Sequence, residues 1–152
     1  WQPCWSWRQS RGQTRVEFLT PSFEDAEAIQ GLPALGVGAQ SLHFLNFVIA
    51  EPIWAAAIYR DGVLFRVPRP ERFAIHKLIV ADRRLEGPDS PKARKDLDQA
   101  ILLMQVLAED RPGDLAAAYQ DAMSRGPRWR DRVQRTLKRS AEAARLVEAV
   151  TA

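Results

Sequence analysis

The stretch IWAAAIYRDGVLFRV at residues 53–67, followed by PRPERFAIHKL at 68–78, decides the fold class. Two runs of β-forming and small apolar residues flank Asp61 and Gly62, a pair typical of a tight hairpin turn in which both residues have positive φ. We therefore expect a β-hairpin over the first stretch. Two prolines then end the strand, and Pro70 suits the first position of a helix. The chain thus changes from strand to helix here.

Helices dominate after this point, because prolines, capping residues and apolar residues at helical spacing recur. We expect four helices: 70–84, a second starting at Ser90-Pro91, a third capped by Asp114 and ending at Gly126, and a fourth from Pro127 that continues or breaks near Ser140.

The first third of the chain reads differently. We expect a strand over 14–20, a short helical turn over 22–30 capped by Ser22, a glycine-punctuated loop over 32–40, and an apolar strand or short buried helix over 42–50. Strands first and helices afterwards predict an α+β fold, with a small mixed or antiparallel sheet followed by a helical C-terminal half. We expect residues 1–68 to form the sheet domain and 69–152 a helical region packed on it.

Composition narrows the class of protein. The chain has 152 residues, 46% of them hydrophobic, and a formal net charge of +3. Its basic residues gather near the C-terminus, where 125–139 hold six arginines and one lysine. The single Cys4 excludes an internal disulfide and a zinc site built from cysteines. With no apolar run long enough for a membrane span and no signal-like start, we expect no membrane partner and a reducing, cytoplasmic location.

One acidic residue stands out in the strand over 14–20. Alternation would place Arg15, Glu17 and Leu19 on one face, with Val16 and Phe18 on the other. A lone carboxylate among β-formers is either a solvated strand residue or a metal ligand, and both interpretations stay open.

The helix over 70–84 contains a candidate phosphate contact. Lys77 shares a helix face with Phe73, so its stem can cross apolar surface while its amine reaches outward to a phosphate or simply to water. His76 alone is more typical of a packed or solvated histidine than of a base. Asp96 and Asp98 lie two apart on a helix and do not face each other, so they cannot hold one ion together.

Cations surround the break between the first two helices. They are Arg83, Arg84, Lys92, Arg94 and Lys95. They form either a solvated face, with pairs such as Lys92 to Asp96, or a rim that attracts a triphosphate. Near the start of the chain, Trp1, Trp5 and Trp7 are either core aromatics or base-stacking residues.

Several of these segments together resemble a bacterial family of nucleotidyltransferase-fold proteins within the DNA-polymerase-β-like superfamily. The resemblance runs from about residue 14 to 130 and rests on RVEFLTP (15–21), LGVGAQ (35–40), VPRPERFAIHKL (67–78), KARKDL (92–97) and RGP (125–127). It implies a mixed sheet with helices, a nucleotide site at the sheet edge, and three carboxylates that hold Mg²⁺.

The resemblance also implies roles for individual residues. Glu17 matches the third carboxylate of the metal site, and Lys77 matches a helix lysine near the nucleotide phosphates. Arg94, Lys95 and Asp96 match an Arg/Lys-Asp helix element common in relatives, with either a structural or a functional role. Arg83, Arg94 and Lys95 are the further candidate phosphate contacts. The implied reaction transfers a nucleoside monophosphate from a nucleoside triphosphate (NTP) to a hydroxyl acceptor, which is a protein, a nucleic acid or a small molecule.

The sequence departs from the family pattern at one point. No Gly-Ser or Gly-Gly followed by a strand-borne Asp-x-Asp occurs, so the first two metal carboxylates are missing. Because one carboxylate cannot supply the ligands that Mg²⁺ requires, we expect the chain to be inactive alone. We expect it to be the C-terminal portion of a truncated nucleotidyltransferase-like fold. The alternatives are a non-catalytic module that binds nucleic acid or protein, for example an antitoxin, and a bare structural fragment.

Overall fold

The computed structural model describes residues 4–152, and it forms two compact units. The first ends at Ile49 and the second is Ala50–Ala152. Trp1, which was expected to be a core aromatic or a base-stacking residue, lies outside the described residues. The hairpin belongs to the unit that holds the helices, whereas the sequence division at 68 groups it with the earlier strands. The assignment of functional domains stays a prediction.

The first unit contains two small sheets. Strand β1 (Ser6–Arg8) pairs with β2 (Arg15–Glu17) in an antiparallel ribbon. In the second sheet, β5 (Val37–Leu42) lies between β3 (Leu19–Pro21), to which it is parallel, and β4 (Ile29–Leu32), to which it is antiparallel. The mixed sheet expected for an α+β fold is therefore present, and the fold class is confirmed.

The strand expected over 14–20 is interrupted at Phe18. The expectation of one continuous strand was therefore wrong. The N–H of Phe18 donates to the carbonyl of Trp5 at 2.9 Å, on the side of the first ribbon. The carbonyl of Phe18 accepts from the N–H of Gln40 at 2.9 Å, on the side of the second sheet. The chain therefore changes sheet at one residue, and the alternation that grouped Glu17 with Leu19 stops there.

Two further segments differ from expectation. The glycine-punctuated segment is not a loop: after a short 3₁₀ turn (Pro33–Leu35) it becomes β5, the central strand, with Gly38 and Ala39 buried. The segment after Ser22 bends without forming a helical turn, and the Ser22 hydroxyl donates to the carbonyl of Ala26 at 3.1 Å. The apolar segment after β5 is a short helix, α1 (Leu45–Val48).

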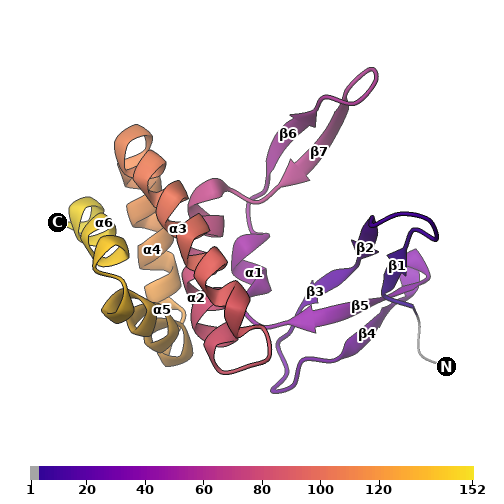
Figure 1. Ribbon diagram of the computed structural model, residues 1–152, viewed down its shortest axis with the longest axis horizontal. Helices are drawn as coiled ribbons and strands as arrows, with labels where there is room; N and C mark the ends of the chain where they lie inside the picture. The colour runs from indigo at the N-terminus through magenta and orange to yellow at the C-terminus, as the bar shows by residue number, and fades with distance from the viewer. Residues whose placement is uncertain (1–3) are drawn as a thin grey trace. The chain divides into compact units, whose positions relative to one another are not determined.

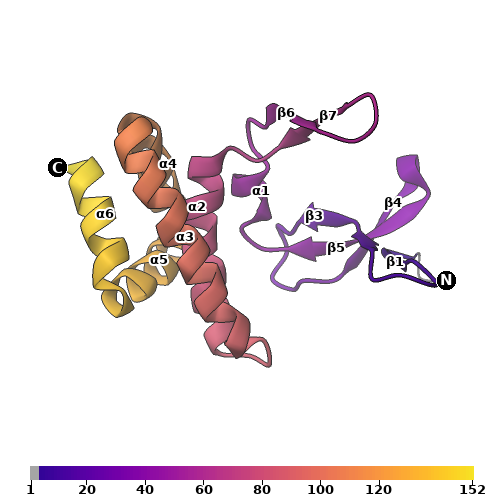
Figure 2. The ribbon, with the colours of Figure 1, turned by 45° about the horizontal axis from the view of Figure 1, so that its top comes forward.

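The expected hairpin is present as β6 (Ile53–Ala57) and β7 (Val63–Val67). Ala57 pairs with Val63, so five residues form the connection rather than two. Positive φ occurs at Arg60 and Gly62, where the two-residue turn would need it at Asp61 and Gly62. Within the second unit, the ribbon extends away from the helices in both ribbon views (Figures 1 and 2).

Five helices follow the hairpin, and their starts coincide with prolines or a capping serine. They are α2 (Pro70–Leu85), α3 (Ser90–Asp110), α4 (Pro112–Ser124), α5 (Pro127–Arg139) and α6 (Ala141–Thr151). The fourth expected helix breaks at Ser140, whose hydroxyl accepts a hydrogen bond from the N–H of Ala143 at 3.2 Å. The third begins at Pro112, two residues before the cap expected at Asp114.

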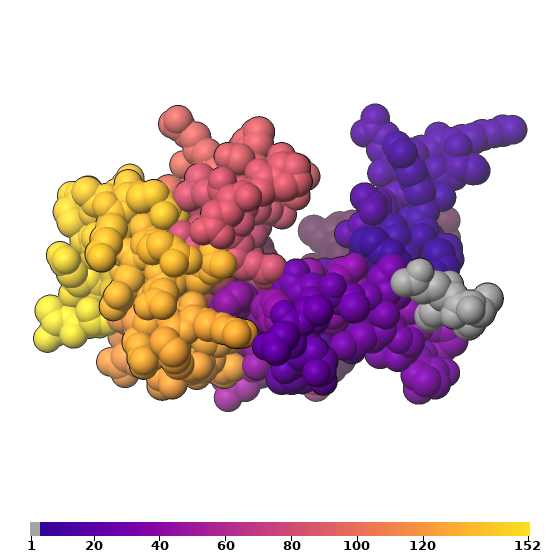
Figure 3. All heavy atoms as spheres, turned by 90° about the horizontal axis from the view of Figure 1, so that it is seen from below, coloured from indigo at the N-terminus to yellow at the C-terminus, as the bar shows by residue number. Residues whose placement is uncertain are grey.

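The core of the second unit lies between these helices. Helices α2 and α3 lie side by side, and α4 to α6 form one continuous mass with them (Figures 1 and 3). The largest fully buried apolar side chains of these helices come from four of them: Ile75, Leu78, Ile79, Met104, Leu115 and Val133. The hydroxyl of Thr136 on α5 donates to the carbonyl of Leu78 on α2 at 2.8 Å, which fixes these helices against each other. None of the described helices is long and apolar enough to cross a membrane.

Candidate functional site

A buried carboxylate holds the amine of Lys77. Lys77 lies on α2, and its Nζ is 2.6 Å from Oδ1 of Asp96 on α3, whose side chain is only 2% exposed. The guanidinium of Arg84 binds the other carboxylate oxygen. Residues seven apart lie two turns along the same helix face, so α2 presents both cations to one acid. We call Lys77, Arg84 and Asp96 the Asp96 cluster.

The aliphatic stem of Lys77 passes along the face of α2 that it shares with Phe73, as the sequence predicts. Its Nζ lies 5.1 Å from the centre of the Phe73 ring, close enough for a cation–π contact. The side chain is mostly covered, and its amine is held by Asp96 instead of extending freely into water. A phosphate role for Lys77 therefore requires a ligand that approaches an amine already fixed in place.

The surroundings of the Asp96 cluster are positively charged. Burial, and then the neighbouring cations Lys77 and Arg83, lower the pKa of His76 from 6.5 to about 4, although Asp96 opposes this. His76 is therefore neutral at pH 7. Lys77 and Arg84 then bring two positive charges to the single carboxylate of Asp96, which leaves an excess of positive charge within the cluster.

A second acidic residue on α2, Asp82, binds three arginines of α5. Arg132, Arg135 and Arg139 on α5 lie 2.8 to 2.9 Å from the carboxylate of Asp82. Burial alone would raise the pKa of Asp82, but hydrogen bonds from Arg135, Arg139 and Arg132 outweigh it and lower the pKa from 3.8 to about 2. The C-terminal basic residues thus fasten α5 to α2. Their spacing of three and four residues on one helix face was the available clue.

The other predicted phosphate contacts do not join Lys77. Arg94 is largely exposed and lies 3.9 Å from Asp98, while Lys95 is exposed. Residues two apart on a helix point in nearly opposite directions, so Arg94 and Asp96 face different sides of α3. Arg83 is the one of the three whose charge is felt at His76, beside Lys77.

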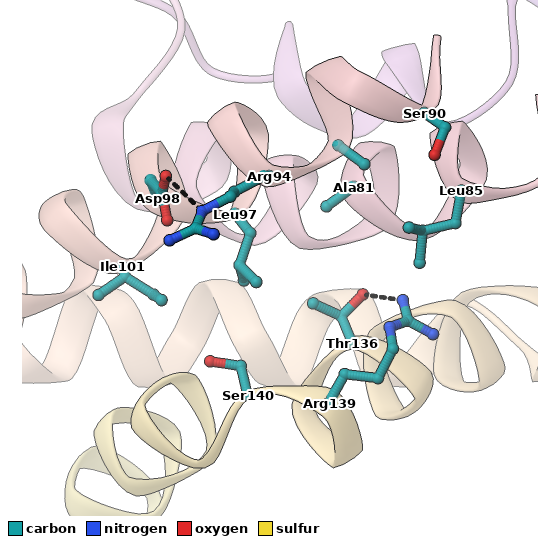
Figure 4. Close-up of a pocket in the computed structure, with 11 residues that line it drawn as sticks. Ala81, Leu85, Ser90, Arg94, Leu97, Asp98, Ile101, Thr136, Arg139 and Ser140 are labelled. Atoms are coloured by element: carbon teal, nitrogen blue, oxygen red, sulfur yellow. Dashed lines mark hydrogen bonds and ion pairs between the residues drawn. The ribbon is translucent and has the colours of Figure 1, made fainter. Parts of the chain in front are cut away.

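Arg94 instead borders a cavity of about 470 Å³ between α2, α3 and α5. Figure 4 shows Leu97 and Ile101 on its wall and Arg139 at the opposite rim. Arg139 donates to Thr136 at 3.3 Å and to Asp82 at 2.8 Å, so it is already engaged. The cavity has an apolar interior and a rim that carries both signs of charge.

Glu17 lies in β2, in the first unit, whereas Lys77 lies in the second. Its carboxylate is 2.7 Å from the guanidinium of Arg15 on the same strand, and both side chains are exposed to solvent. Over residues 4–152, no three Asp, Glu, His or Cys side chains gather closely enough to hold a metal ion. The described residues therefore do not fit Mg²⁺ by themselves, and the role of Glu17 as a ligand stays a prediction.

Comparison with known proteins identifies the family of this chain. A family model described as Nucleotidyltransferase matches residues 2–124, most of the chain. The chain belongs to this nucleotidyltransferase family. Searches of curated proteins and of solved structures gave no match.

The family match spans the strands of both units and ends at the C-terminus of α4. The Asp96 cluster of this nucleotidyltransferase-family chain lies wholly inside the matched range. The three arginines that hold Asp82 lie beyond it. The Asp96 cluster is therefore the better candidate for a function that the family shares.

Proposed function

We propose that this chain takes part in nucleotidyl transfer, in which an NTP gives its nucleoside monophosphate to a hydroxyl acceptor and releases pyrophosphate. Family membership supports the reaction class. The observation that carries the proposal is the Asp96 cluster, because it holds a lysine amine in place within an excess of positive charge. Such fixed cations can stabilise the negative charge of a triphosphate and of the departing pyrophosphate.

The predicted phosphate contacts then contribute to binding in different ways. Lys77 is the direct contact, because Asp96 and the Phe73 ring fix its position. Arg83 adds charge beside it. Arg94 and Lys95 lie on other sides of α3, and they would contribute only to the general attraction of an anion.

Nucleotidyl transfer of this kind requires a metal ion, and we propose Glu17 as one ligand of a Mg²⁺ site. Oxygen ligands suit this ion, but a single carboxylate paired with Arg15 is not a site. Further carboxylates must come from outside the described residues. The chain alone is accordingly expected to bind NTP weakly and to show no transfer.

Binding of a fluorescent ATP analogue tests the phosphate role. We expect Lys77→Ala to weaken binding roughly tenfold and Arg83→Ala roughly threefold, since a hydrogen bond to a charged group is worth about 1.5–3 kcal/mol and a more distant charge less. Arg83→Ala is the safer variant, because Lys77→Ala leaves the buried Asp96 with one partner fewer. Loss of one partner of a buried ion pair costs about 3–5 kcal/mol of stability.

The matched control is Arg145→Ala, which removes one positive charge from an exposed position on α6. Circular dichroism of every variant checks the fold. Equal affinity in the Arg83→Ala and Arg145→Ala proteins, with Lys77→Ala folded and also unaffected, would refute the phosphate site.

A further inference from the structure

The β6–β7 hairpin exposes apolar and aromatic side chains over its whole length. Each of the following is at least 41% exposed: Trp54, Ile58, Tyr59, Val63, Leu64 and Phe65. Ile58, at the start of the connecting loop, is fully exposed. A concentration of apolar surface on so short a segment marks a site that contacts another molecule.

Neither face of the ribbon is covered. Trp54 pairs across the strands with Arg66, and Ala55 pairs with Phe65 on the other face. Trp54, Phe65 and Arg66 are all exposed, so both faces present a ring to solvent. An isolated two-stranded hairpin is marginally stable in water. The hairpin thus gains from a bound partner that covers its side chains.

The charges of the hairpin indicate what kind of partner this is. The guanidinium of Arg66 lies 5.1 Å from the centre of the Trp54 ring, and that of Arg60 lies 5.4 Å from the Tyr59 ring. Within residues 4–152 no carboxylate pairs with either arginine, in contrast to the arginines that hold Asp82. Asp61 is the only acid between Ile53 and Val67.

We propose that this hairpin binds a single-stranded nucleic acid, and, resting on the proposed nucleotidyl transfer, that such a strand is the acceptor. Bases stack on exposed aromatic rings with little regard for sequence, and arginines above those rings add cation–π contacts and reach phosphates. Trp54 with Arg66 and Tyr59 with Arg60 are two such pairs on one ribbon. A purely apolar protein partner would bury both guanidinium groups without a hydrogen-bond partner, which is unfavourable.

Fluorescence anisotropy with a labelled oligouridylate of about 12 nucleotides tests the proposal on the full 152-residue chain. We expect Trp54→Leu to weaken binding roughly tenfold, whereas Trp54→Phe retains most of it, because phenylalanine stacks and leucine does not. Both variants keep an apolar side chain at an exposed position, so both should fold.

Salt dependence provides an independent readout. Arg66→Ala and Arg60→Ala should each lower the slope of log affinity against log salt concentration by about one, as expected for a lost phosphate contact. Arg145→Ala is the control and should leave the slope unchanged, because that residue lies on α6.

The outcomes separate this inference from the proposed function. Hairpin variants should bind the ATP analogue as the parent does. Oligonucleotide binding without ATP binding supports the hairpin site and counts against nucleotidyl transfer; the reverse result refutes the hairpin site alone. Equal affinity of the Trp54→Leu and Trp54→Phe proteins, or a dimer in sedimentation that excludes the oligonucleotide, overturns the proposal.

Discussion

Several acidic side chains in the second unit each bind more than one basic side chain. Glu71 binds Arg69 and Arg111, Asp82 binds three arginines of α5, Asp96 binds Lys77 and Arg84, and Asp121 binds Arg72 and Arg125. A buried acid with several partners fixes the helices that supply them. The groups around Asp82 and Asp96 contain more cations than acids, whereas in the other two groups Asp114 and Glu51 also bind an arginine.

His76, next to Lys77, gives these charges a measurable effect on stability. Its pKa is lowered from 6.5 to about 4 in the folded protein, mainly by burial. Between these values the unfolded chain binds a proton that the folded chain does not, so stability falls as the pH decreases from about 6.5 to about 4. We expect the free energy of unfolding in urea to decline over this window in the parent, and less in His76→Gln. Parallel declines in the two proteins would contradict this prediction.

At the residue scale, the sequence predicts the course of Lys77 along an apolar ring but not its partner. Helical spacing also offered a pair of Lys92 with Asp96 under one of the two interpretations of the basic face, and the structure does not contain this pair. Lys92 pairs with Asp89 at 2.6 Å, while Asp96 binds cations of a different helix. Spacing along one helix indicates local pairs, whereas a buried acid selects partners that packing between helices brings close.

At the scale of elements, helix starts were the most predictable feature. Proline fixes φ at a helical value and lacks the N–H that a first turn cannot use, so Pro70, Pro112 and Pro127 each mark a start. The central strand β5 was missed, since Gly36 and Gly38 are typical of loops. Gly38 is buried there, in the central strand of the sheet.

Two serines at helix starts give a matched pair of variants. The Ser140 hydroxyl caps α6, so we expect Ser140→Ala to lower the free energy of unfolding by about 1 kcal/mol. Ser90 begins α3 and is of a residue type that favours the cap position, but that helix has no side-chain cap hydrogen bond. Ser90→Ala should therefore be nearly neutral. Urea unfolding followed by circular dichroism measures both, and equal losses would show that neither effect comes from the cap.

At the scale of the whole molecule, the boundary between the units at Ile49 could not be read from composition. The hairpin resembles the earlier strands in sequence, and only the backbone contacts group it with the helices. The family match covers both units. The nucleotidyltransferase resemblance was thus recoverable from short motifs, while the arrangement of charges that makes a candidate site was not.

The second unit holds an apolar core of its own, so we expect residues 50–152 to fold without the rest. Ile75, Met104 and Val133, from three helices, are all fully buried within it. A fragment of these residues should give a helical circular dichroism spectrum and a cooperative thermal transition. A gradual, non-cooperative transition would mean that the core needs residues before Ala50.

The change of sheet at Phe18 has a mechanical consequence for the first unit. One residue supplies its N–H to one sheet and its carbonyl to the other, so a strain that opens either sheet pulls directly on its neighbour. Tension applied at Glu17 therefore reaches Gln40 through one residue, Phe18, and the two-stranded ribbon and the three-stranded sheet deform together.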